Sequence, residues 1–511
     1  GRTGADSGAG LPDGRFAFAA HATQDRGWRD ATGFREQKAN LKWGGEIGAG
    51  QLTTSLSLTR LDQETGGFIN GFDTYRSRTA ARANANPEAF REASAARWLT
   101  RWSTPEPAGW EVTGYARASR MRFLQHFLLG KPLERNGQQS LGLMVSRGFD
   151  WAGLRWRAGL DAERADSYLI EFQAGPTLDG TPAARAIRPA GFHYDYRVAS
   201  TLLAPWLTFE RRLGEYWTLS GSLRSDRTRY AYDNRMLAGN TSDTGVACAG
   251  GCLYSRPTDR TDRFTNTTPR LAIAWQPHSQ LTAWASFARG FRPPEGTELY
   301  RLQRQQQVAD LRSETASSAE VGMRGRRKDL AWSAAAFAMD KRNVILRDAS
   351  AFNVSDGRTR HRGIELEAAW SPRDWLTLST EATYARHEYR FNRSAEQGER
   401  IVSGNAVDTA PRRLHNLRLT LRPRADLQAE LEWVSVGPYF ADAANTARYP
   451  GHELLNARAE WAVNDHWAVT LRGTNLTDRA YADRADVAFG TWRYFPGRPR
   501  AAFLEVSWQP R

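Results

Sequence analysis

The feature that most constrains this chain is a two-residue alternation of apolar and polar side chains. In the segment around Leu366, Ile364 and Leu366 share one face while Glu365 and Glu367 occupy the other, and residues 502–508 repeat the pattern. Successive side chains of a strand point to opposite faces, whereas those of a helix repeat every 3.6 residues. The pattern therefore predicts long β-strands.

Short polar turns join these segments in pairs, and longer loops join one pair to the next. Turns such as 213–215 and 372–374 recur at intervals of about 40 to 65 residues. Each interval holds two long strands and one long loop, such as 62–96 or 230–265. A propeller blade would instead place four short strands in that interval. Long alternating strands with short turns on one side and long loops on the other predict an outer-membrane barrel.

The expected fold is all-β, a transmembrane antiparallel β-barrel with long extracellular loops and short periplasmic turns. We count about 20 strands between residues 15 and 509, an even number as in bacterial barrels. The barrel domain is expected over residues 15–511, after a leading turn or linker over residues 1–14. A barrel of this width holds water or a plug, so charged residues suit its lumen. The alternative is a two-layer soluble β core, although a soluble sandwich does not need so many long strands.

Composition indicates a folded chain without a membrane helix. The 19 Trp, 16 Tyr and 22 Phe exclude a disordered chain, and no run approaches the roughly 18 consecutive apolar residues of a membrane helix. The net charge is +14, and five of the 70 basic residues are lysines. The charge is scattered, whereas nucleic-acid binding gathers it on one face. The arginine bias reflects either GC-rich coding or attraction to anionic ligands and surface lipids.

The two cysteines, Cys248 and Cys252, flank a glycine-rich turn and predict a loop disulfide in an exported protein. A metal site would need more ligands, and the nearest histidines in sequence, His193 and His278, are dozens of residues away. We therefore expect no metal site.

Catalytic motifs are missing from the sequence: it has no HExxH, no P-loop and no GxSxG. We therefore expect no enzyme, with an outer-membrane hydrolase that uses a dispersed Ser and His as the less favoured alternative. The chain starts at Gly1 without a signal peptide, so any export signal lies outside this sequence.

Four segments carry a family resemblance. They are FARGFRPPEGTELY at 287–300, LRSETASSAEVG at 311–322, RGIELE at 362–367 and TNLTDRAY at 474–481. In this order they resemble segments of the TonB-dependent outer-membrane receptors. The resemblance implies a multi-pass β-barrel in the outer membrane of a Gram-negative bacterium, in contact with outer-membrane lipid and lipopolysaccharide.

The resemblance also implies a function. It implies uptake of a ferric siderophore or a similar large nutrient complex, driven by the TonB-ExbB-ExbD complex through a plug domain and its TonB box. Neither the plug nor the box is visible, so we expect a barrel without its plug, with about 20 visible strands of a likely 22. Iron would enter only as part of the transported chelate, and no cofactor is expected. A passive plugless porin or channel is the alternative function.

Two segments are the candidate ligand-binding loops. Residues 66–78 combine aromatic rings with arginines, a mixture suited to anionic chelates with planar parts. Residues 120–127 have a similar composition. The alternative is that loop aromatics pack the loops together. The candidate residues are Phe68, Phe72, Tyr75, Arg76 and Arg78 in the first segment and Arg122, Phe123, His126 and Phe127 in the second.

Overall fold

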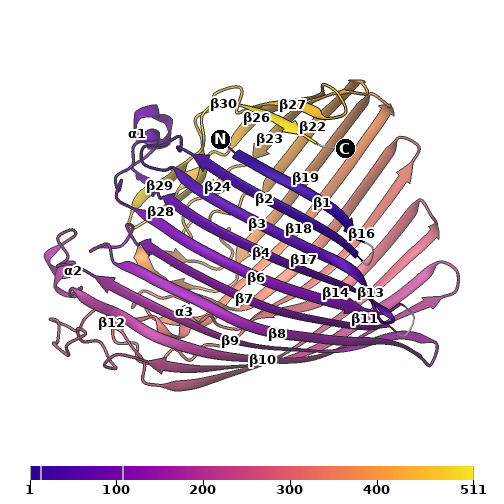
Figure 1. Ribbon diagram of the computed structural model, residues 1–511. Helices are drawn as coiled ribbons and strands as arrows, with labels where there is room; N and C mark the ends of the chain where they lie inside the picture. The colour runs from indigo at the N-terminus through magenta and orange to yellow at the C-terminus, as the bar shows by residue number, and fades with distance from the viewer. Residues whose placement is uncertain (1, 12–13, 106–108, 510–511) are drawn as a thin grey trace.

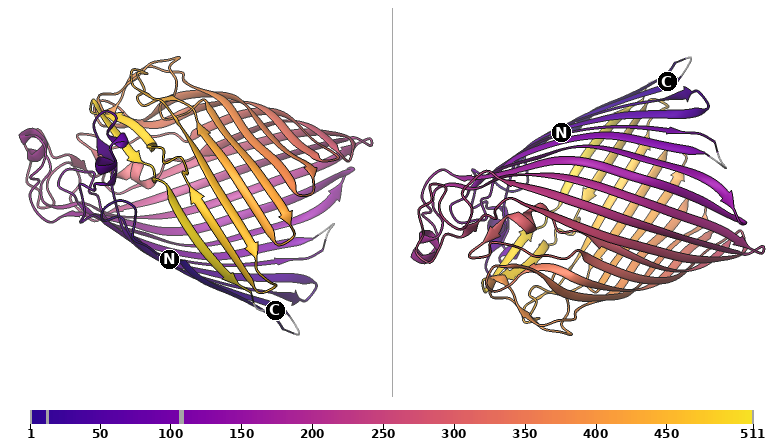
Figure 2. Two further views of the ribbon diagram at one scale, coloured as in Figure 1. Left: turned by 90° about the horizontal axis from the view of Figure 1, so that it is seen from above. Right: turned by 90° about the horizontal axis from the view of Figure 1, so that it is seen from below.

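A computed structural model describes residues 2–11, 14–105 and 109–509. Its main element is a sheet of 21 strands in which each strand pairs antiparallel with the next main strand of the sequence. The strands tilt together and the sheet curls into a barrel, which brings β1 near β30 (Figures 1 and 2). The predicted all-β barrel is confirmed.

The strands of the main sheet are β1 (Arg2–Leu11), β2 (Gly14–Asp25), β3 (Phe34–Ile47), β4 (Gly50–Glu64), β6 (Phe90–Ser103), β7 (Trp110–Leu124), β8 (Leu133–Trp151), β9 (Leu154–Gln173), β10 (Gly191–Leu213), β11 (Trp217–Asn234), β13 (Arg260–His278), β14 (Leu281–Arg292), β16 (Glu314–Arg327), β17 (Leu330–Arg347), β18 (Asn353–Arg373), β19 (Leu376–Tyr389), β22 (Arg413–Arg424), β23 (Leu427–Val436), β26 (His452–Ala462), β27 (Trp467–Thr474) and β30 (Ala501–Trp508). A transmembrane strand needs about 9–11 residues. Since β10 has 23 residues, such strands extend beyond the bilayer.

The N-terminal segment corrects one expectation. The linker expected over residues 1–14 is wrong for residues 2–11, which form β1 and pair with β2 from Arg2↔Thr23 to Leu11↔Gly14. This segment is rich in Gly and Ala and lacks the apolar alternation by which the other strands are recognised, and backbone pairing with β2 continues without it. Residues 1, 12 and 13 lie outside the described residues. Twenty strands follow β1, in agreement with the count made over residues 15–509.

The short turns lie at one end of the barrel and the long loops at the other. The turn between β10 and β11 contains Gly214 at φ 67°, and the turn between β8 and β9 contains Gly153 at φ 73°. Glycine adopts this left-handed backbone at no steric cost, which allows a hairpin of two or three residues. The predicted division into short turns and long loops is therefore correct.

The two faces of the strands differ in chemistry. On β18, Ile364 is 50% exposed and Leu366 is 48% exposed, and Ile364 lies beside Tyr384 of β19. This apolar face continues around the sheet and suits the bilayer. On the opposite face, Arg224 donates to Asp226 at 3.0 Å and pairs with Asp161 of β9. Charges that pair in this way suit a wet lumen.

Smaller elements occupy the loops. They are the helices α1 (Arg78–Arg82), α2 (Pro182–Ala186) and α3 (Gly296–Tyr300), the 3-10 turns η1 (Thr74–Arg76) and η2 (Glu396–Gly398), and the short strands β5 (Ile69–Asn70), β12 (Tyr254–Ser255), β15 (Leu302–Gln303), β20 (Arg393–Ser394), β21 (Arg400–Ile401), β24 (Tyr439–Phe440), β25 (Arg448–Tyr449), β28 (Ala482–Ala488) and β29 (Thr491–Pro496). In the part of the chain that the structure describes, no helix has the length and apolar character needed to span a membrane.

Candidate ligand-binding mouth

The long loops gather at one end of the barrel, which we call the mouth (Figure 2). All the helices and short strands described above lie in these loops. They form two packed aromatic groups, an outer cluster built by loops 65–89, 437–451 and 475–500, and an inner cluster built mainly by loops 235–259 and 293–313.

The outer cluster is a group of packed tyrosines. The Tyr75 ring lies 4.7 Å from that of Tyr494 and 5.7 Å from that of Tyr449, and Tyr449 lies 5.1 Å from Tyr439, centroid to centroid. Burial raises the pKa of Tyr494 to about 12, so its hydroxyl stays neutral. Tyr75, predicted as a ligand contact, is buried and instead packs the loops together.

The backbone also joins two distant loops at this cluster. Strand β5 pairs with β29 through Asn70↔Arg493 and Ile69↔Tyr494, so the first candidate loop forms the edge of the β28–β29 hairpin. Gly497, just after β29, lies under the Tyr481 ring, where a Cβ would come within 2.1 Å of the ring. Glycine is therefore required where the chain leaves this hairpin.

An exposed aromatic surface lies on top of the outer cluster. Phe72 is 73% exposed and meets Trp492 edge to face, with centroids 5.9 Å apart. Trp492 stacks on Tyr494 at 5.4 Å with the rings parallel to within 2°. The Arg493 guanidinium lies 4.9 Å from the centroid of Phe68. A planar ligand finds both an exposed ring and a cation here.

The two candidate arginines of the first loop lie at its surface. Arg76 pairs with Asp73 at 3.0 Å, and Arg78, whose side chain is 82% exposed, pairs with Asp478. We call Phe72, Arg76, Arg78, Trp492 and Arg493 the mouth edge. It joins residues of loop 66–78 to residues of a loop about 400 positions later in the chain.

The second candidate segment is less of a loop than expected. Arg122 and Phe123 belong to β7, because strand alternation continues to Leu124. Arg122 pairs with Glu92 at 3.2 Å on one face of the wall, whereas Phe123 on the other face lies 5.7 Å from the Arg91 guanidinium. The expectation that these two residues form one loop surface is therefore wrong.

The remaining two residues of that segment do lie in a loop. Phe127 is exposed, and its ring meets that of His126 at 5.6 Å. The His126 ring lies so close to Gly67 that a Cβ there would come within 2.9 Å of Nε2. Burial lowers the pKa of His126. His126 thus supports the first candidate loop as a neutral packing group.

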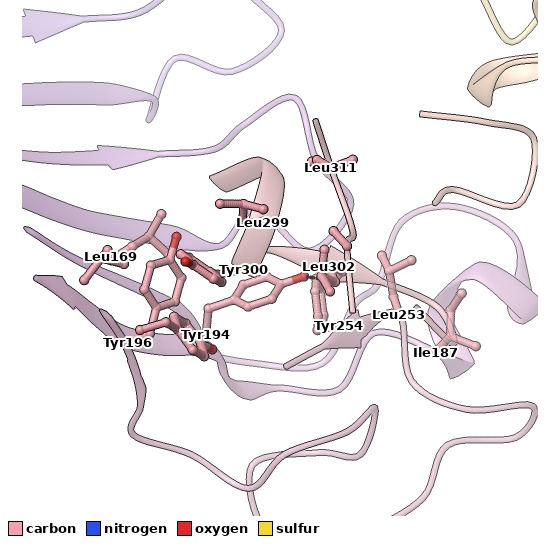
Figure 3. Close-up of a cluster of buried hydrophobic side chains, with 13 residues drawn as sticks. Leu169, Ile187, Tyr194, Tyr196, Leu253, Tyr254, Leu299, Tyr300, Leu302 and Leu311 are labelled. Carbon is pink, nitrogen blue, oxygen red and sulfur yellow. Dashed lines mark hydrogen bonds between the residues drawn. The ribbon is translucent and has the colours of Figure 1, made fainter. Parts of the chain in front are cut away.

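The inner cluster lies below the mouth edge (Figure 3). Tyr300 of α3 is fully buried and stacks on Tyr232 of β11, with centroids 4.2 Å apart. Its hydroxyl donates to Asp262 at 2.8 Å, and the Tyr194 hydroxyl donates to the Leu302 carbonyl. These contacts hold loop 293–313 against the barrel wall.

A buried ion pair network fixes the end of α3. Arg301 pairs with Glu171 of β9, lies 3.3 Å from Glu134 of β8 and donates to Gln125 Oε1 at 3.0 Å. Burial disfavours the Arg301 cation, but the two carboxylates outweigh it and raise the pKa of the guanidinium. His193 lies 2.9 Å from the other oxygen of Glu171. The network is internally satisfied, so it holds the loop.

The FRPP segment is equally structural. Arg292 donates to both carboxylate oxygens of Glu298 at 2.9 Å and lies 3.1 Å from Glu314. The backbone of Glu295 in turn donates to Glu298 and completes a capping box on α3. The segment therefore positions α3 and the inner cluster.

The loop before β12 is held by a disulfide and a buried arginine. Cys248 and Cys252 form the disulfide, with Cα atoms 4.8 Å apart. Arg256 donates to the carbonyls of Leu237 at 2.7 Å and Thr241 at 2.8 Å, and burial lowers the pKa of its guanidinium. Within residues 2–11, 14–105 and 109–509, no group of three or more His, Cys, Asp or Glu residues is placed to hold a metal ion.

Sequence reasoning missed the C-terminal half of the mouth edge. Residues 492–495 (WRYF) alternate aromatic and basic residues, the same mixture that identified loop 66–78. They escaped notice because loop 475–500 reads as an ordinary link between the last strands. Their contact with residues 68–75 depends on the curvature of the whole barrel.

Comparisons with known proteins agree with this architecture. The family model described as TonB dependent receptor-like, beta-barrel matches residues 3–476. A vitamin B12 transporter from Photobacterium profundum is 25% identical over 236 residues, which is 44% of this chain and 36% of that protein. The chain thus aligns with about a third of the length of this curated relative.

Solved structures share the fold at low identity. The siderophore receptor PiuA from Acinetobacter baumannii superposes with a TM-score of 0.78 at 15% identity, covering 99% of this chain and 79% of that one. The ferric citrate transporter FecA in its unliganded form gives a TM-score of 0.79 at 16% identity, covering 98% and 74%. At this identity the likeness establishes the fold alone.

Proposed function

We propose a function from the premise that this chain belongs to the TonB-dependent receptor family: its mouth captures a ferric siderophore or a similar anionic metal chelate for uptake. The family places the barrel in the outer membrane of a Gram-negative bacterium, and its members are receptors and transporters rather than enzymes. In this proposal, the TonB-ExbB-ExbD complex supplies the energy for transport, and iron is cargo rather than a cofactor.

The observation that carries the proposal is the chemistry of the mouth edge. Phe72 and Trp492 present ring surface next to Arg76, Arg78 and Arg493. Exposed rings bind planar groups such as catechol or aryl rings, and guanidinium groups bind carboxylates and other anions in a bidentate manner. A ferric chelate with a negative charge and an aromatic or carboxylate shell matches both features.

The relatives support a large metal complex without naming it. Their printed names include ferric citrate, a siderophore and vitamin B12, which differ in size and charge. The basic and aromatic character of the mouth edge favours the anionic ferric chelates among them. The experiment must therefore compare several chelates.

Direct binding to purified protein tests the proposal. Ferric citrate, a ferric catecholate and cyanocobalamin are titrated separately against the wild-type barrel and the double variant R76A/R78A. We expect saturable binding of a ferric chelate, weakened about tenfold in the double variant because two charge-assisted contacts are removed. The variant R185A, which removes an exposed arginine of α2, serves as the matched control and keeps wild-type affinity. Equal affinity of R76A/R78A and wild type for every ligand would contradict the assignment of this loop.

A further inference from the structure

The outer surface of the wall carries unbalanced positive charge on β17, β18 and β19. Residues directly opposite each other in this sheet include Arg342↔Arg358 and Arg362↔Arg386. Like charges placed directly opposite on one face destabilise a strand pair. Two such pairs on neighbouring strands therefore require a compensating anion.

Nearby carboxylates do not supply enough compensation. Asp340 pairs with Arg360 at 2.6 Å and Glu388 pairs with Arg386 at 2.5 Å. Among the described residues, no ion pair is formed by Arg342, Arg358 or Arg362. We call the five residues Arg342, Arg358, Arg360, Arg362 and Arg386 the arginine patch. It carries three more positive charges than the two carboxylates balance.

Alternation places the patch on the lipid side of the wall. Arg362 has the same parity on β18 as Ile364, Leu366 and Trp370, which are all well exposed. Arg386 has the same parity on β19 as the exposed Tyr384, which lies opposite Ile364. The lumen face of these strands carries His361 and His387 instead, with Nδ1 atoms 2.8 Å apart.

The height of the patch matches the outer edge of the bilayer. Trp370 lies at the short-turn end, where its indole donates to Asp329 of the turn at 2.8 Å, a position suited to the periplasmic aromatic girdle. Eight residues along a tilted strand rise about 20 Å, so Arg362 and Arg386 lie near the top of an apolar band about 25 Å tall. Arg342 and Arg358 lie one step further out.

We propose that the arginine patch binds the phosphate groups of a lipid in the outer leaflet, the phosphorylated glycolipid lipopolysaccharide. Guanidinium groups bind phosphate in a bidentate manner, and the apolar side chains directly below the patch lie where the acyl chains of that lipid run. A soluble phosphate would satisfy the charges but not the apolar surface. The position at the boundary between charge and apolar wall selects an amphiphile.

Similar pairs occur elsewhere at the same side of the barrel. Arg122↔Arg135 and Arg229↔Arg263 are also directly opposite each other, and all four side chains are exposed. Arg122, which the sequence suggested as a chelate ligand, belongs to this outer surface. The patch on β17–β19 is the densest part of a discontinuous basic belt.

The test uses the barrel refolded without lipopolysaccharide in a neutral detergent. Its thermal midpoint is measured while purified lipid A, dephosphorylated lipid A or inorganic phosphate is added. We expect lipid A to raise the midpoint in a saturable way, and neither dephosphorylated lipid A nor inorganic phosphate to do so. In R362Q/R386Q, the half-saturating concentration of lipid A should rise about tenfold, as expected for the loss of charge-assisted contacts.

Two further variants make the test decisive. R342Q/R358Q removes the second pair and should have a similar effect, which guards against a folding defect in the first variant. R458Q/R472Q removes a cross-strand arginine pair that alternation places on the lumen face, and it should respond as wild type does. Equal stabilisation by dephosphorylated lipid A, or an unchanged response in both patch variants, would overturn the proposal. An equal response to inorganic phosphate would overturn the assignment to a lipid.

Discussion

Tyr300 stacks on Tyr232 with ring centroids 4.2 Å apart and planes within 20° of parallel, although 67 residues separate them in sequence. This contact joins α3 to the barrel wall. It explains why the loop that follows the FRPP segment is packed against the wall below the mouth edge.

Replacing Tyr300 by alanine should release this loop. Truncating a buried aromatic side chain costs about 3–5 kcal/mol, so we expect faster amide exchange in residues 293–313 while the barrel strands stay protected. Hydrogen–deuterium exchange with mass spectrometry measures this directly. Y216A, at an exposed turn tyrosine, is the control and should leave exchange in that loop unchanged. Protection of residues 293–313 in Y300A would show that Tyr300 does not hold the loop.

Arg301 should be needed to neutralise two buried carboxylates. In R301M, Glu171 and Glu134 lose their cation, and breaking a buried pair in this way costs about 3–5 kcal/mol. The defect should shrink as the pH is lowered, because protonation of either carboxyl removes an unpaired charge. Protease sensitivity of loop 293–313 at pH 7.5 and pH 5 measures both effects, with R304M as the exposed control. A defect independent of pH would contradict the electrostatic explanation.

Acidification should loosen the contact between His126 and loop 66–78. Burial lowers the pKa of His126 in the folded protein below its ordinary value of 6.5. The stabilising contribution is therefore present above pH 6.5 and is lost as the pH falls below 6.5 towards the folded pKa. Glu88, Lys131 and Arg91 also act on this ring. Exchange of residues 66–78 should increase between pH 7 and pH 5 in wild type and much less in H126F; an equal increase in both would contradict this role.

Reduction of the disulfide should have a local effect. The bridge between Cys248 and Cys252 closes a short loop, for which chain entropy gives about 2 kcal/mol. C248S/C252S should therefore speed cleavage of residues 235–259 by a limited protease without changing the thermal midpoint of the barrel. Arg256 should keep part of that loop in place through its carbonyl contacts. Loss of the folded barrel in this variant would show that the bridge has a wider role.

The fold could be predicted because strand alternation is local. The opposite faces of Ile364 and Glu365 are visible in the sequence, and so are most turns. Strand β1 could not be predicted in this way, because its side chains do not alternate and its pairing with β2 is a property of the backbone.

The site could be predicted only in part. Arg76 and Arg78 lie at the surface as expected, but Tyr75 is buried and Arg122 faces the outside of the wall. Burial of a loop aromatic depends on which other loop reaches it, and Trp492 reaches Phe72 only after the barrel has brought the two loops together. Composition identifies such candidates, and curvature decides between packing and exposure.

The most direct measurement of the central claim is a crystal structure of the barrel with a bound ferric chelate, in which the anomalous signal of iron locates the ligand. The account predicts an iron peak over the mouth edge, in contact distance of the chelate shell from Phe72, Trp492 and the Arg76 or Arg78 guanidinium. An iron peak in the lumen far from these residues, or a chelate that binds without contacting them, would contradict it.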